Sequence, residues 1–204
     1  MIVTEIAEFS KQKVKVYIDY EFAFVLYKGE LRTYQLKVGT ELSQELYHKI
    51  VDEVLIKRAK LRCMNLLKSR DYTKYQLASK LRQGLYPQEV IDEAIAYCVS
   101  YRYLDDLRYA KAYIGYAQNS KSRKQIEQDL LKKGVNTEDI AAAFDDKQEK
   151  EDLVEEEELI AKILVKKHYK REMATYEERQ KIIGFLYRKG FSLDKIYKVV
   201  GEID

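Results

Sequence analysis

The sequence predicts a mainly helical protein, built from three tandem three-helix units in an elongated curved array and preceded by a small N-terminal antiparallel β-sheet. Three observations lead to this fold. Apolar residues alternate with polar ones in the first forty residues, but recur every three or four residues after Ser43. Proline occurs once and glycine eight times in 204 residues, which is too few for the turns of an all-β protein. Finally, a glycine-centred pattern occurs three times in the helical part.

The N-terminal segment, residues 1–42, has the signals of a sheet with three or four strands. Residues 14–19 alternate between apolar and polar, as in a strand with one buried face. Residues 22–27 form a short aromatic and β-branched run, and residues 28–30 offer a hairpin turn. Residues 31–38 alternate again, so we expect a further strand there.

The helical part divides into units over residues 43–104, 105–147 and 148–204. Each unit should start with a longer helix, at about 43–69, 106–119 and 150–170. The next helix in each unit ends in a basic turn followed by a glycine, where a positive φ costs glycine nothing. A last helix should begin within about three residues of that glycine. The repeated glycines are Gly84, Gly134 and Gly190, and the apolar residues six and ten positions later are Val90, Ile140, Ile196, Ala94, Phe144 and Val200.

The predicted starts of these helices carry capping signals. A hydroxyl residue followed three positions later by Glu or Gln forms a capping box, in which two side chains satisfy each other's free backbone amides. Pro87 suits the first turn of the helix after Gly84. The predicted boxes pair Thr73 with Gln76, Ser122 with Gln125, and Thr175 with Glu178.

Composition excludes several classes of protein. The formal net charge is only +3, and no apolar run approaches the roughly 18 residues of a membrane span. The first ten residues lack the pattern of a secretion signal, and two cysteines cannot form a disulfide framework. We therefore expect a cytoplasmic protein. Residues 147–158 are strongly acidic, which is typical of an exposed helix start or linker.

Reactive side chains are sparse, so the sequence argues against an enzyme. The two histidines, His48 and His168, lie far apart, and no spacing of Cys and His suits zinc. Cys63 and Cys98 occupy apolar helix positions, where cysteine usually acts as a small buried hydrophobe. The acidic pairs 105–106 and 145–146 are expected to cap helices rather than to bind a metal. We expect no cofactor and no metal.

Binding remains, because basic last turns and tyrosines recur at equivalent points of the three units. Lysine and arginine mixed with tyrosine can hold phosphates and stacked bases. However, tyrosine supplies 18 of the 24 aromatic residues and must also build much of the core. Both interpretations remain open on composition alone.

The segment 103–110, Tyr-Leu-Asp-Asp-Leu-Arg-Tyr-Ala, is the most specific motif. Upstream lie Arg70 and Thr73, then Leu-Ala-Ser-Lys-Leu over residues 77–81; downstream lies a basic helix end before Gly134. Over residues 58–200 this ordered set resembles the RecX family of regulatory proteins. The family usually has glycine where Arg102 and Lys121 stand here. The motif residues are Asp105, Asp106, Arg108, Tyr109 and Ala110.

The resemblance implies a helical, non-catalytic modulator of the RecA recombinase in DNA recombination and repair. Such proteins bind RecA, lie along the groove of its filament on single-stranded DNA, and inhibit its ATPase and strand exchange without a cofactor. Arg108 is the first candidate for a filament contact because the motif selects it, and an ion pair with Asp105 or Asp106 is the structural alternative. The full candidate set is Arg70, Arg108, Arg123, Lys124, Lys132 and Lys133.

Two other functions remain open from the sequence. The chain could bind single-stranded DNA directly and act by competition. It could also be a helical adaptor whose N-terminal sheet accepts an extra strand at an exposed edge.

Overall fold

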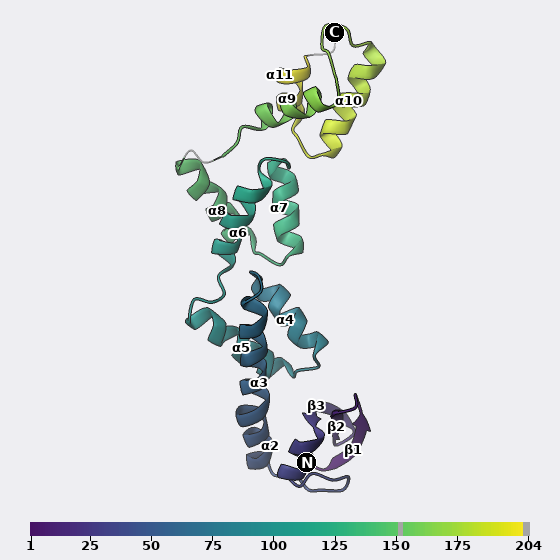
Figure 1. Ribbon diagram of the computed structural model, residues 1–204, viewed down its shortest axis with the longest axis vertical. Coiled ribbons are helices and arrows are strands. Elements are labelled where there is room, and N and C mark those ends of the chain that lie inside the picture. The colour runs from purple at the N-terminus through teal and green to yellow at the C-terminus, as the bar shows by residue number, and fades with distance from the viewer. Residues whose placement is uncertain (151–152, 202–204) are drawn as a thin grey trace. The chain divides into compact units, whose positions relative to one another are not determined.

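The computed structural model describes residues 1–150 and 153–201 (Figure 1). The chain forms two compact units, Met1–Asp105 and Asp106–Asp204. The described residues are mainly helical, with one antiparallel sheet at the N-terminus, as the sequence predicts.

The sheet has three strands in the order β1 (Val3–Glu8), β2 (Lys13–Ile18) and β3 (Glu21–Tyr27). Along β2, buried residues alternate with partly exposed ones, which confirms the predicted period of two. The chain returns beside β1 after residue 38, where the Val3 amide donates to the Thr40 carbonyl at 2.9 Å.

The predicted turn at 28–30 and the further strand at 31–38 are wrong. Residues Lys28–Thr33 form the short helix α1 instead. The Glu30 carboxylate accepts a hydrogen bond from the Tyr27 amide at 2.7 Å and so caps the helix that contains it. Arg58, 28 residues further along the chain, also binds this carboxylate. A contact at such a separation is invisible to a local pattern, which explains the error.

The rest of the first unit is helical. A continuous helical run consists of α2 (Gln44–Ile50), the π-helical segment η1 (Val51–Ile56) and α3 (Lys57–Leu67), as expected for 43–69. Two helices follow, α4 (Lys74–Gln83) and α5 (Gln88–Ser100). The sheet and these helices share one hydrophobic core, which includes Val16, Phe24, Leu55, Leu77 and Ile91.

The second unit contains two helical bundles, each with its own core. The middle bundle consists of α6 (Asp106–Ala117), α7 (Arg123–Lys132) and α8 (Thr137–Glu149). The C-terminal bundle consists of α9 (Glu156–Lys166), α10 (Tyr176–Arg188) and α11 (Leu193–Val200). The helix expected over 150–170 is shorter than predicted, because α8 continues to Glu149 and His168 adopts a φ of +54° after α9 ends. Part of that predicted range, 151–152, lies outside the described residues.

The glycine pattern is confirmed at two of its three positions. Gly134 and Gly190 have φ values of +81° and +84°. At Gly84 the prediction is wrong: its φ is −81°, and Leu85 takes the positive φ, at +58°. A side chain at Gly84 would put its first carbon 3.1 Å from the Leu81 carbonyl oxygen, so this glycine permits a close approach instead.

The other repeat predictions are largely confirmed. All six apolar residues at the sixth and tenth positions after the glycines are buried. Thr73 and Thr175 form complete capping boxes. Ser122 shows half of one: its hydroxyl accepts from the Gln125 amide at 3.3 Å and donates to the Lys189 carbonyl at 2.6 Å. Pro87 takes the position before the first residue of α5.

Candidate functional site

The Asp-Asp-x-Arg-Tyr-Ala motif combines buried residues with an exposed arginine. Helix α6 starts at Asp106, which is buried, and Ala110 lies in the core of the middle bundle. The Tyr109 ring stacks against Tyr113 with a centroid separation of 6.4 Å. Asp105 and Arg108 are exposed. The motif therefore sets the start and packing of α6, and Arg108 is its member that presents a positive charge at the surface.

Arg70 lies in the first unit, in the loop between α3 and α4. Its guanidinium stacks over the Tyr72 ring at 4.3 Å from the centroid. Tyr72 is itself buried, so the ring is a fixed base for the arginine. A guanidinium held over an aromatic ring can keep its hydrogen-bond donors available at its edge.

Arg123, by contrast, is engaged within the second unit. Its Nε donates to Glu127 at 2.9 Å, and its guanidinium lies 4.4 Å from the centroid of the Phe144 ring. Its backbone amide donates to Glu156 at 2.6 Å. Lys124, the next residue, is exposed. The contacts of Arg123 indicate a structural role, which makes Lys124 the better placed of the two for a partner.

Lys132 lines a hollow of about 460 Å³ in the second unit, together with Lys121, Asp129 and Lys189. This hollow brings together two lysines from the repeated basic helix ends, Lys132 and Lys189. The ammonium of Lys133 lies 5.3 Å from the centre of the Tyr113 ring.

One ion pair fixes the wall of this hollow. The Lys121 ammonium donates to Asp129 at 2.6 Å and to the Tyr113 hydroxyl at 3.1 Å. The hydrogen bond from Lys121 lowers the pKa of Asp129, and the same bond raises the pKa of Lys121. Both groups are therefore charged at neutral pH, and they neutralise each other. Lys132 and Lys189 provide the net positive charge there.

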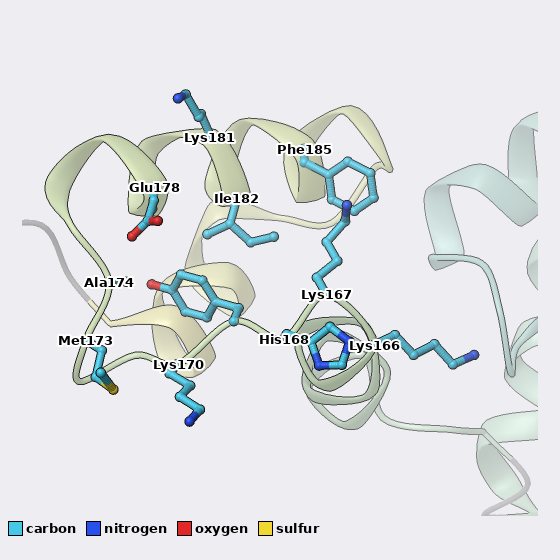
Figure 2. A pocket seen from close by; sticks show the side chains of 11 residues that line it. Lys166, Lys167, His168, Lys170, Met173, Ala174, Glu178, Lys181, Ile182 and Phe185 are labelled. Carbon is cyan, nitrogen blue, oxygen red and sulfur yellow. The ribbon is translucent and has the colours of Figure 1, made fainter.

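A larger hollow, of about 690 Å³, lies in the C-terminal bundle, and it contains none of the candidate residues from the sequence. Its basic residues come mostly from the segment after α9 (Figure 2). The sequence contains a signal for it: residues 166–171 read Lys-Lys-His-Tyr-Lys-Arg, a basic run that includes an aromatic residue. The basic residues that line the hollow are Lys166, Lys167, His168, Lys170 and Lys181.

No group of three or more His, Cys, Asp or Glu among the described residues could hold a metal ion. Cys63 and Cys98 are both fully buried, as predicted, and a hydrogen bond with Cys98 together with burial raises the pKa of the Cys63 thiol. The prediction that the pair 145–146 caps a helix is wrong: both residues lie inside α8, and Asp146 pairs with Lys111 at 2.9 Å. In the part of the chain that the structure describes, no helix could span a membrane.

Comparison with known families finds three successive matches in the helical part of the chain. The first three-helix domain of the RecX family matches residues 59–98. The second three-helix domain of the same family matches residues 105–143, and the third matches residues 155–200. A regulatory protein RecX from Caldanaerobacter subterraneus subsp. tengcongensis is 32% identical over 202 residues, covering 98% of each chain. This chain belongs to the RecX family.

Other RecX proteins give the same result. The regulatory protein RecX of Leuconostoc mesenteroides is 32% identical over 188 residues, covering 91% of this chain and 69% of its own. A crystal structure of regulatory protein RecX aligns with a TM-score of 0.64 at 25% identity, over 98% of both chains. The crystal structure of RecX from Lactobacillus salivarius shares the fold, with a TM-score of 0.61 at 24% identity over 72% of this chain.

The structure shows the backbone and contacts at the two positions where the resemblance to RecX predicts glycine. Arg102, at the first of them, adopts a φ of +56°, the left-handed region that glycine favours. The turn therefore keeps the backbone of a glycine turn. Lys121, at the other position, uses its side chain to join α6 to α7 through Tyr113 and Asp129.

Proposed function

We propose that this chain binds the RecA recombinase filament on single-stranded DNA and limits its ATPase and strand-exchange activities in recombination and DNA repair. The observation that supports this most strongly is the match to three RecX domains, in order, together with a RecX relative aligned over nearly the full length of both chains. Such a chain acts by occupying a surface, so exposed basic side chains are the groups to examine.

The proposed contact residues fall into three groups by their surroundings. Arg70, stacked on Tyr72, and Arg108, exposed on α6, present guanidinium groups that suit phosphate or carboxylate partners. Lys124 and Lys132 are exposed lysines of α7, and Lys133 lies beside the Tyr113 ring. Arg123 is the weakest of the six candidates because Glu127 and Phe144 already engage it.

Fluorescence anisotropy of the labelled protein against three titrants at one salt concentration tests the proposal. The titrants are bare single-stranded DNA, free recombinase, and the filament locked with a nucleotide analogue. We expect the filament to bind most tightly, and we expect ATP hydrolysis by the filament to fall as the chain is added. Equal binding to bare DNA and to the filament would favour simple competition for the strand. No binding to any of the three would refute the proposal.

The role of Arg108 is tested by Arg108→Ala, with the exposed Arg32→Ala in α1 as the matched control. Both substitutions remove one surface guanidinium from a helix. We expect Arg108→Ala to weaken filament inhibition by about tenfold, the effect of losing one charge-assisted hydrogen bond at the lower end of its range, and Arg32→Ala to leave it unchanged. A folded Arg108→Ala protein that inhibits as well as the wild type would exclude a contact role.

The adaptor alternative has less support. Removing residues 1–40 is not a clean test of it, because the sheet shares its core with α2–α5. The outer edge of β1 is also partly covered, since Val3 exchanges backbone hydrogen bonds with Gly39 and Thr40. Substitutions on the open half of that edge, at residues 5–8, would test strand addition without removing the core.

A further inference from the structure

The hollow in the C-terminal bundle lies between residues 166–174, from the end of α9 onward, and residues 178–185 of α10. Ile182 and Phe185 on α10 face the segment that carries Lys167 and His168 (Figure 2). Lys166, Lys170 and Lys181 extend outward at its edge. The hollow therefore has an apolar floor and a basic rim.

The rim lysines differ from three other lysines of the same bundle. Lys162, Lys195 and Lys198 each pair with a carboxylate of α9, at 3.1–3.9 Å. Within the described residues, none of the rim lysines, which are Lys166, Lys167, Lys170 and Lys181, forms an ion pair. The bundle thus neutralises its lysines on one side and leaves a concentrated positive charge around the hollow.

The carboxylate that lines the hollow, Glu178, offsets only one of the four lysine charges. Glu178 accepts hydrogen bonds from the backbone amide and the hydroxyl of Thr175, at 3.0 and 3.2 Å, so it serves to cap α10. Lys167 lies 4.0 Å from the centre of the Phe185 ring, which holds its ammonium against the floor. An anion that enters therefore meets several lysines and one carboxylate that is already engaged.

Tyr169 adds a buried donor that lacks an acceptor. It lines the hollow, and its hydroxyl is screened from solvent without a hydrogen-bond partner among the described residues. Leaving such a group unpaired is costly, and native proteins rarely do so without a functional reason. A small movement of the Tyr169 ring toward the hollow would bring this hydroxyl to a ligand oxygen, which would be its acceptor.

We propose that this hollow binds a segment of single-stranded DNA, with phosphates at the lysine rim and a base on Ile182 and Phe185, where the base takes the place of the Lys167 ammonium. An apolar and aromatic floor suits the face of any base, whereas an acidic peptide would use the lysines alone. The inference rests on the proposed function for the choice of strand, since a recombinase filament carries single-stranded DNA. It assigns the contact to residues that the RecX motif does not include.

Binding of a short fluorescein-labelled oligothymidylate, without recombinase, tests the site. The test variant is Lys170→Gln with Lys181→Gln, and the matched control is Lys162→Gln with Lys198→Gln, which removes the same charge from the same bundle. We expect the test variant to bind about tenfold more weakly at low salt and to reduce the slope of log affinity against log salt by about 1.4, because each phosphate contact contributes about 0.7 for a single strand. The control should keep the wild-type slope.

A second variant, Tyr169→Phe, separates binding from folding. It removes the unpartnered hydroxyl and keeps the ring, so the folded protein should be at least as stable as the wild type. We nevertheless expect it to bind the oligothymidylate about threefold to tenfold more weakly. A structural role alone would not weaken binding while stability is kept.

Three results would overturn the inference. The first is equal affinity and equal salt slope for the test and control variants. The second is an absence of oligothymidylate binding by the wild type. This outcome would not decide the filament proposal, which the anisotropy titration with the filament tests separately. The third is displacement of the oligothymidylate by polyglutamate as readily as by unlabelled strand, which would indicate an acidic peptide instead. If the chain binds the strand through the hollow but ignores the filament, the inference holds and the proposed function fails.

Discussion

Arg58 offers the most informative test of how the N-terminal sheet is held to the helices. Its guanidinium donates to both carboxylate oxygens of Glu30, at 2.5 and 2.6 Å, and to the Val25 carbonyl at 3.1 Å. It also lies 4.8 Å from the centre of the Tyr27 ring. One α3 side chain thereby fixes the end of β3 and the start of α1.

The expected cost of Arg58→Ala follows from these contacts. The side chains of Arg58 and Glu30 are only 19% and 26% exposed, so solvent screens this pair much less than a surface pair. Hydrogen bonds to charged groups contribute about 1.5–3 kcal/mol each when well shielded, and a cation over a ring adds about 0.5–1 kcal/mol. Allowing for the remaining exposure, we expect Arg58→Ala to lower the free energy of unfolding by about 2–3 kcal/mol. Arg58→Lys should recover only part of this loss, because an ammonium cannot bind both oxygens and the carbonyl in one plane.

Urea denaturation of the full chain, together with hydrogen exchange of the β2 and β3 amides, measures this effect locally. Lys28→Ala is the matched control. Lys28 also pairs with a glutamate, Glu8, at 2.8 Å, but the two side chains are 46% and 67% exposed. We expect this control to leave exchange in the sheet unchanged.

Two outcomes would refute the reasoning about Arg58. If Arg58→Lys were as stable as the wild type, the planar guanidinium would have no special role. If Arg58→Ala and Lys28→Ala had the same small effect on sheet exchange, the pair with Glu30 would not fix α1.

Two further predictions concern the second unit. Gly190→Ala should lower the free energy of unfolding more than Gly39→Ala does. Both glycines have φ near +85°, so each substitution introduces about 1 kcal/mol of backbone strain. A Cβ at Gly190 would also lie 2.8 Å from the Ser122 hydroxyl, whereas nothing lies within 4 Å of a Cβ at Gly39. Equal losses in urea denaturation would argue against the close approach. Asp129→Asn should destabilise the fold at neutral pH by under 1 kcal/mol, because Lys121 lowers the pKa of Asp129 and this pair is partly exposed to solvent. The stabilisation is present above the ordinary aspartate pKa of about 4 and disappears as pH falls through the lowered pKa of Asp129. The free energies of unfolding of the two proteins should therefore become equal in acid. A difference that persists at low pH would show that Asp129 acts other than by its charge.

The candidate residues show which features of the site the sequence predicts and which it does not. The repeat and the RecX motif selected Arg108, which the structure places at the surface. The same reasoning selected Arg123, which Glu127 and Phe144 engage. It passed over the basic run 166–171, because a run of charges by itself does not reveal which lysines have carboxylate partners.

The sequence by itself determined the three-helix repeats, their capping residues and the RecX family. These depend on local chemistry, such as the period of apolar residues, a threonine that accepts from the amide three positions later, or a glycine at positive φ. Tertiary structure alone decided three other features. Arg58 turned a predicted hairpin into α1 through Glu30. Leu85, rather than Gly84, took the left-handed position at the first repeat. The basic hollow formed because α10 folds back beside the segment after α9. Each depends on atoms far apart in the sequence or on steric fit in three dimensions, and a linear pattern contains neither.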